Sequence, residues 1–159
     1  MAPLDGIRIA DFSWVGAGPF LTKPLADHGA EVIKVESRVR TDVIRSMPPF
    51  RDGVPGVDRS GYFADRNSSK RSICLDLRDP EARDLAHRLI AVSDVVVDNF
   101  RGGVMQRLGI GWDRLSAENP RLIHTSITGY GATGALASLP GFDPVFQARS
   151  GLMLAQGRD

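Results

Sequence analysis

Residues 67–100, NSSKRSICLDLRDPEARDLAHRLIAVSDVVVDNF, limit the fold of this 159-residue chain more than any other part of it. They join a basic turn, an apolar strand, an amphipathic helix and a second strand built around consecutive valines. A strand, a helix and a strand in this order predict two parallel strands joined by a right-handed crossover. Ligands bind outside the carboxyl ends of the strands in such a sheet, so the residues that follow each strand are the first candidates for a site.

The first 36 residues follow the same pattern. Residues 7–12 and 31–36 have the composition of strands, and the helix between them is expected to begin near Pro19 and to end at His28 and Gly29. The pattern predicts a parallel α/β domain. Its further elements are strands at 72–77, 94–98 and 122–128, a helix that starts at an Asp79 cap and buries Ala82, Leu85, Ala86, Leu89 and Ile90, short helices at 102–109 and 112–118, and a last helix at 144–154.

Residues 37–69 form the largest stretch without a regular pattern. The segment contains Pro48, Pro49 and Pro55, several glycines and charges of both signs. Loops of this length in a compact domain are usually functional or disordered. Two interpretations stay open at this point: a surface excursion that covers a site, or a flexible loop with no role.

Composition excludes several classes of protein. A chain of about 150 residues is long enough for one domain with a real core, and 42% hydrophobic with 25% charged residues is ordinary for a globular protein. A net charge of +1 gives no reason to expect nucleic acid or a membrane as a partner, although local clusters such as Lys70 and Arg71 can bind phosphate. The N-terminus lacks a signal-peptide pattern, and no apolar run is long enough to cross a bilayer. The single cysteine, Cys74, is expected to be a small buried residue and fits a cytoplasmic location.

The glycines at positions 16 and 18 match a nucleotide-binding turn only in part. A dinucleotide fingerprint needs a third glycine, and Leu21 stands at that position. Glu36 ends the second strand, where the ribose-binding acid would stand, but NAD or FAD binding is not expected on this partial match. A metal site is not expected either, because His28, His87 and His124 are far apart in sequence and no C-x-x-C spacing occurs.

Six segments carry a resemblance that covers nearly the whole chain. In order, they are LDGIRIADFSWVGAGPF, LADHGAEVIKVE, NSSKRSICLDLRDPEA, SDVVVDNFRGGVMQRLGIGW, NPRLIHTSITGYGATG and PGFDPVFQARSGLM. With these separations they look like the N-terminal part of a family III coenzyme A transferase, the CaiB/BaiF group that includes formyl-CoA transferase. Together these motifs are far more specific than any single glycine pattern.

The resemblance implies a Rossmann-like coenzyme A domain with flanking helices. Residues 1–159 would form its N-terminal part, with a long loop at 37–69, and a second domain would lie outside this chain. The resemblance also implies two substrates, an acyl-CoA and a carboxylic acid acceptor, and a homodimer with interlocked subunits or a complementing subunit. In the family, an aspartate carboxylate attacks the acyl-CoA thioester, and a mixed anhydride and an aspartyl-CoA thioester follow.

The family's nucleophilic aspartate is expected to fall after Asp159, well beyond the segment Gly141-Phe142-Asp143. This chain is therefore expected to lack its own nucleophile. Asp143 matches an acidic position that lines the active site of formyl-CoA transferase, which implies an auxiliary role in orienting the intermediate. A structural alternative stays open, in which Asp143 caps the helix that starts at Pro144.

The resemblance also implies a set of coenzyme A contacts, most of them at the ends of the predicted strands. The phosphates of the coenzyme suit arginine, which grips them in bidentate fashion. Position 16 differs from formyl-CoA transferase, which has a glutamine there, and this disfavours formate and oxalate as substrates. The matched positions are Val15, Gly16, Leu75, Asp76, Leu77, Arg78, Asn99, Phe100, Arg101, Arg107, Leu139, Pro140, Gly141 and Phe142.

Two other functions stay open. The α-methylacyl-CoA racemases resemble this chain but have a histidine immediately before the acidic residue, where it serves as a base. Phe142 stands there and cannot move a proton, and His124 lies too early in the chain to be its obvious replacement. The other alternative is a non-catalytic coenzyme A binding domain that acts with a partner chain.

Overall fold

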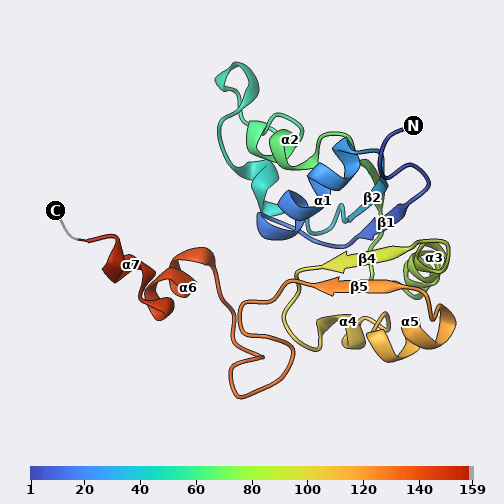
Figure 1. Cartoon of the computed structure of the whole chain (residues 1–159). Coiled ribbons are helices and arrows are strands. Elements are labelled where there is room, and N and C mark those ends of the chain that lie inside the picture. The colour runs from blue at the N-terminus through green and yellow to red at the C-terminus, as the bar shows by residue number, and fades with distance from the viewer. Residues whose placement is uncertain (158–159) are drawn as a thin grey trace.

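A five-stranded parallel sheet forms the centre of the molecule in the computed structural model, which describes residues 1–157 (Figure 1). All neighbouring strands are parallel. Their order across the sheet is β3-β2-β1-β4-β5, which is the order of a Rossmann-like fold. The predicted fold class is therefore confirmed. The strands are β1 (Arg8–Asp11), β2 (Glu31–Glu36), β3 (Arg71–Cys74), β4 (Val95–Asp98) and β5 (Ile123–Ser126).

Helices cover both faces of this sheet (Figure 1). On what we call the first face lie α1 (Ala17–Asp27) and α2 (Gly61–Asn67). On the second face lie α3 (Pro80–Ala91), α4 (Val104–Arg107) and α5 (Trp112–Glu118). Asp79 caps α3 as predicted, since its carboxylate accepts a hydrogen bond from the Glu81 N–H at 3.0 Å. None of the helices within residues 1–157 has both the length and the apolar character needed to span a membrane.

Alternation along the central strands divides the core between the two faces. On the first face, Ile9 of β1 and Val97 of β4 pack with Ala26 of α1. On the second face, Ala10 and Val96 pack with residues of α3, α4 and α5. Apolar side chains therefore pack against β1 and β4 on both faces of the sheet. The second-face core consists of Ala10, Phe12, Val35, Leu75, Ala82, Ala86, Ile90, Val96, Met105, Ile110, Leu115 and Leu122.

Residues 37–69, which we call the excursion, are more regular than predicted. They contain two short 3-10 helices, η1 (Val43–Ser46) and η2 (Arg51–Gly53), followed by α2, which packs against α1. Ser60 caps α2, because its Oγ accepts a hydrogen bond from the Phe63 N–H at 3.2 Å. The sequence pattern missed α2, because its 7 residues follow a stretch of prolines, glycines and mixed charges that indicates a loop.

Two burial predictions are wrong. Cys74 is exposed, because β3 is an edge strand whose residues are all exposed. Leu85, predicted on the buried face of α3, is 45% exposed, whereas Ala86 and Ile90 on the same helix are fully buried. The predicted apolar face was too wide, since the helix turns Leu85 away from the sheet.

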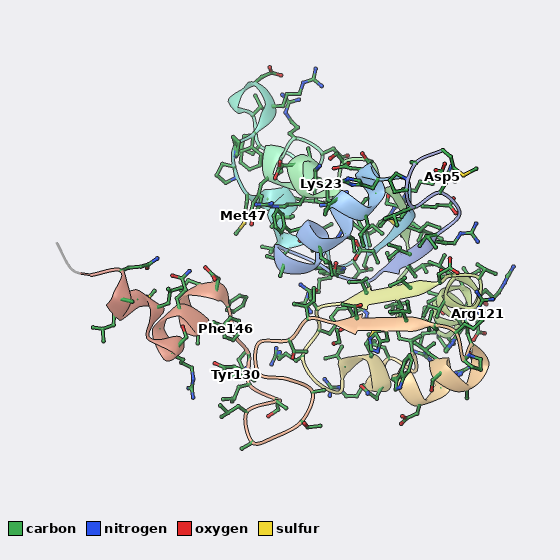
Figure 2. All side chains as sticks on the ribbon, viewed as in Figure 1. Asp5, Lys23, Met47, Arg121, Tyr130 and Phe146 are labelled. Atoms are coloured by element: carbon green, nitrogen blue, oxygen red, sulfur yellow. The ribbon has the colours of Figure 1, made fainter. Side chains whose placement is uncertain are left out.

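The last part of the chain, residues 129–157, is called the arm, and its helical end stands away from the sheet (Figure 1). It ends in α6 (Asp143–Ser150) and α7 (Leu152–Ala155), and no residue of either helix is buried. The single helix predicted at 144–154 is broken at Gly151, whose φ of 81° is left-handed. Figure 2 shows Tyr130 facing Phe146 within the arm, with ring centroids 5.2 Å apart.

Candidate functional site

The turn after β1, residues 12–16, lies at the topological switch point of the sheet, because β1 pairs with β2 on one side and β4 on the other. Ligands bind in the crevice at such a point. Asn99, directly after β4, holds this switch-point turn. Its Oδ1 accepts a hydrogen bond from the Trp14 N–H at 2.8 Å, and its Nδ2 donates to the Trp14 carbonyl at 2.6 Å. Both backbone polar groups of Trp14 are therefore fixed by one side chain.

A buried ion pair holds the same turn from the direction of β2. Lys34 of β2 donates to the Ser13 carbonyl at 2.7 Å and lies 3.4 Å from Asp42, with side chains 1% and 0% exposed. Asp42 accepts a hydrogen bond from the Val15 N–H at 3.1 Å. Val15 has a φ of 66°, a left-handed conformation that is costly for a β-branched residue. The contacts of Lys34 and Asp42 stabilise the turn in this strained conformation.

A second buried ion pair joins β1 to the residue that follows the excursion. Lys70 Nζ lies 3.2 Å from Asp11 Oδ2 and also donates to the Pro19 carbonyl and to Asn67 Oδ1, each at 3.1 Å. Asp11 also accepts a hydrogen bond from the Ser13 N–H at 3.0 Å. Desolvation lowers the pKa of Lys70 to about 8, against the opposing effect of the Asp11 carboxylate.

The two glycines near the turn have different surroundings. A side chain at Gly18 would overlap Ser13, so only glycine permits this close approach of α1 to the turn. A β-carbon added at Gly16 would meet one atom within 4 Å, the Tyr62 hydroxyl of α2 at 3.7 Å. Gly16 therefore opens onto space that the excursion borders.

The predicted phosphate ligands are not equivalent. Arg78 donates from Nε and Nη2 to the two carboxylate oxygens of Asp76, at 3.0 and 2.7 Å. The hydrogen bonds from Arg78 lower the pKa of the Asp76 carboxyl. Arg101 and Arg107 are exposed, and neither side chain makes a hydrogen bond or ion pair within residues 1–157. A phosphate would have to compete with Asp76 for Arg78 but not for the other two arginines.

Three predicted contact residues have apolar side chains that serve the fold. Leu75 belongs to the second-face core, and Leu77 and Phe100 pack against it. A ligand at these positions would therefore meet mainly backbone groups.

The structure does not bring residues 139–142 to the switch-point turn. Among the described residues no hydrogen bond or ion pair joins the two, and Phe142 is 70% exposed on the arm. The capping alternative for Asp143 is wrong, because Phe142 occupies the N-cap position and Asp143 is the first residue of α6. The Asp143 carboxylate accepts a hydrogen bond from the Gln147 side chain instead.

The sequence pattern missed the four charged residues that hold the turn. Asp11 and Lys34 are charged residues within predicted strands, and side chains of this kind usually face solvent. Lys70 lies next to Arg71 in a basic cluster, and Asp42 lies in the excursion, where no regular pattern indicates its burial. No pattern in the sequence distinguishes buried pairs of this kind from surface charges.

Two surface hollows of about 340 and 310 Å³ lie on the excursion, and neither is lined by the switch-point turn. Both are lined by Asp58, whose carboxylate is already paired with Arg45 at 2.7 Å. We therefore do not assign the ligand site to them. Among residues 1–157, no cluster of three or more histidine, cysteine, aspartate or glutamate side chains is arranged to hold a metal ion.

Comparison with known proteins decides the family. The model of a family described as CoA-transferase family III matches residues 4–159. The chain belongs to CoA-transferase family III. Among solved structures, this family III chain is similar to a CaiB/BaiF family protein from Brucella suis, with 40% identity and a TM-score of 0.86 over 96% of this chain and 40% of that one.

Two curated relatives of this family III chain are 41% identical to it. They are the succinate–glutarate CoA-transferase of Agrobacterium fabrum and the acetyl-CoA:oxalate CoA-transferase of Acetobacter aceti. Each match covers 98% of this chain and 39% of the relative. The chain thus spans less than half the length of the curated relatives it matches.

Proposed function

We propose that the protein carrying this chain transfers coenzyme A from an acyl-CoA to a carboxylic acid, and that this chain supplies part of the coenzyme A binding domain. The observation that carries the proposal is the switch-point turn, whose backbone is fixed by Asn99, Lys34 and Asp42. Family membership and the activities in the relatives' names support it. The proposed partners are an acyl-CoA, an acceptor acid and a second copy of the chain.

In this proposal the coenzyme lies across the carboxyl ends of β1, β3 and β4. Its phosphates bind Arg107 and Arg101, whose guanidinium groups are unpaired within residues 1–157. Arg78 joins them when its bond to Asp76 is replaced by a bond to phosphate. The backbone at Val15 and Gly16 faces the reacting end of the coenzyme.

The proposed reaction follows covalent catalysis. A carboxylate oxygen of an aspartate attacks the acyl-CoA carbonyl carbon, and the coenzyme A thiolate leaves to give a mixed anhydride. The thiolate then attacks the aspartyl carbonyl and releases the first acid as its carboxylate. The acceptor carboxylate and the thiolate repeat these steps in reverse, which forms the new acyl-CoA and restores the aspartate. We assign the nucleophile to a position after Asp159 and an auxiliary role to Asp143.

Titration calorimetry with acetyl-CoA tests the binding part of the proposal. Arg107→Ala should weaken binding by about 1–3 kcal/mol, because a charge-assisted contact to phosphate is lost. Arg114→Ala is the matched control, since Arg114 is exposed on α5 and pairs with Glu118 at 2.7 Å. Equal affinities in the two variants would remove Arg107 from the site.

Mass spectrometry after incubation with an acyl-CoA and hydroxylamine tests the chemistry. A hydroxamate on an aspartate beyond residue 159 of the protein is the expected result. A hydroxamate on Asp143, together with loss of turnover in Asp143→Asn, would contradict the assignment of the nucleophile. Binding of acetyl-CoA without turnover or hydroxamate would indicate a non-catalytic coenzyme A binding protein.

A further inference from the structure

Residues near the start of the excursion and directly after its end hold the switch-point turn. Asp42, near its start, binds the Val15 N–H, and Lys70, directly after its end, binds Asp11. Asp11 in turn binds the Ser13 N–H. The charged side chains of the two ion pairs are at most 1% exposed. Buried ion pairs contribute little net stability compared with apolar residues of similar size, so a concentration of them at one turn points to a role in fixing its conformation.

We propose that Asp42 and Lys70 are positioning residues that lock the switch-point turn in the conformation that binds the coenzyme, an inference that rests on the proposed function. Neither residue needs to touch the coenzyme. The excursion is then a part of the site, because its two ends set the geometry of Ser13 and Val15. This differs from both sequence interpretations, a cover over the site and a loop without a role.

The conformation of the switch-point turn depends on the charge of Lys70, because the hydrogen bonds of Lys70 require its ammonium form. The ammonium group has three N–H donors and meets three acceptors, which are Asp11 Oδ2, the Pro19 carbonyl and Asn67 Oδ1. A neutral amine has one donor fewer, so at least one of these contacts is lost on deprotonation.

The charged groups around Lys70 set the pH range of this change. Asp11 of β1 favours the ammonium form, Lys34 of β2 opposes it, and Asp42 of the excursion favours it. Because burial leaves the pKa of Lys70 at about 8, Lys70 should lose its proton and at least one of these hydrogen bonds in mildly alkaline solution, and the turn should become less rigid.

Stability and affinity should then change in opposite directions with pH. The folded-state pKa of Lys70 lies below the ordinary value of 10.5, so the unfolded chain holds this proton more tightly and the folded state gains stability as the pH rises above about 8. Affinity for the coenzyme should fall over the same range, because the turn is released. A purely structural role for Lys70 would not make affinity fall while stability rises.

The test uses the whole protein in a Cys74→Ser background, which removes the exposed thiol. The probe is acetyl-CoA, which has no free thiol and whose phosphates are ionised above about pH 7. Calorimetry gives its affinity between about pH 7 and about pH 9.5, and chemical unfolding gives the stability over the same range. Amide hydrogen exchange of Trp14 and Val15, corrected for the intrinsic effect of pH, reports the turn without any ligand.

Lys70→Met is compared with Arg71→Met, which removes a neighbouring charge that is 77% exposed and paired with Glu31. We expect Lys70→Met to weaken acetyl-CoA binding by about tenfold and to make the affinity independent of pH above about pH 7. In the Arg71→Met control, as in the unsubstituted protein, affinity should fall and exchange at Val15 should rise with pH.

Three results would overturn the inference. They are unchanged exchange of Trp14 and Val15 across the pH range, an affinity that does not fall above about pH 8, and a folded Lys70→Met variant with unaltered binding. If Lys70→Met does not fold, the pH series on the protein without that substitution decides alone. If acetyl-CoA does not bind at all, the proposed function fails, and the exchange measurement still decides whether Lys70 locks the turn.

Discussion

Side chains that alternate along β1 and β2 meet two different interiors. On the second face, Phe12 and Val35 join an apolar core with α3, α4 and α5. On the first face, Asp11, Lys34 and Glu36 are buried at the same end of the same strands. Each has a partner of opposite charge, which is Lys70, Asp42 or Arg45 respectively. The carboxyl ends of β1 and β2 are thus packed against apolar residues on the second face and against ion pairs on the first face.

This difference separates the part of the molecule that stabilises the fold from the part that shapes the turn. Burial of apolar surface in the second-face core stabilises the folded state, and this core tolerates substitutions that conserve side-chain volume. The ionic side must keep each charge matched, because a buried charge without a partner costs several kcal/mol. The turn with the left-handed Val15 is tied to the ionic side by Asp42. Specific geometry, more than stability, is what the charges supply there.

The largest expected effect comes from breaking one buried pair. Lys34→Met leaves the Asp42 carboxylate buried without its cation and should lower the free energy of unfolding by about 3–5 kcal/mol. Urea denaturation measures this change. Lys23→Met is the matched control, because Lys23 pairs with Asp27 on the partly exposed surface of α1 and its loss should cost less than about 0.5 kcal/mol.

A double variant sharpens that result. Lys34→Met combined with Asp42→Asn removes both charges and keeps an acceptor for the Val15 N–H, so it should recover most of the lost stability. If Lys34→Met were no more destabilising than Lys23→Met, the first face would not depend on matched charges.

The second prediction concerns the apolar side. Ile90 of α3 is 1% exposed, and Ile90→Ala should cost about 2–5 kcal/mol through lost contacts and a residual cavity. Leu85→Ala on the same helix should cost much less, because Leu85 is 45% exposed. Urea denaturation of both variants compares them directly. Similar losses would mean that Leu85 is buried after all, as its position in the sequence pattern suggested.

The sequence predicted one of these two sides better than the other. Apolar periods in α3 and Val96 in the valine run of β4 predicted the second-face core, except for Leu85, because burial of apolar residues leaves a period in the chain. Lys34 within EVIKVE has the spacing of a solvated strand residue, and nothing local indicates that Asp42 reaches it. Asn99 was predicted at the end of β4 because strand ends can be located, whereas its bonds to Trp14 depend on packing of β1 beside β4.

The third prediction uses pH to compare the faces. Because the folded-state pKa of Lys70, about 8, lies below 10.5, the unfolded chain binds more protons between these values, and stability should rise with pH. One group contributes at most about 1.4 kcal/mol per pH unit. Chemical unfolding between about pH 8 and about pH 10 measures the slope. Lys70→Met should remove this contribution, whereas Ile90→Ala should lower the curve without changing its slope. Parallel curves for Lys70→Met and the unsubstituted protein would contradict the assignment.

The last prediction compares a helix cap on each face. Asp79→Ala removes the exposed cap of α3, which binds only the Glu81 N–H, and should cost about 1 kcal/mol. Ser60→Ala removes a buried cap whose hydroxyl lies 2.7 Å from the carbonyl oxygens of Ile44 and Met47 and can donate its single hydrogen to one of them at a time. The Ile44 carbonyl would keep its hydrogen bond from the Met47 N–H at 3.2 Å, so the loss falls mainly on the Met47 carbonyl. The cost of Ser60→Ala should therefore be larger, up to about 3 kcal/mol.

Thermal unfolding of the two variants shows which one is less stable, and amide exchange in α1 and η1 shows which part of the molecule each variant affects. Ser60→Ala should raise exchange in η1 because it releases the excursion, while Asp79→Ala should leave the first face unchanged. The reverse order would mean that the excursion is held by its ion pairs alone.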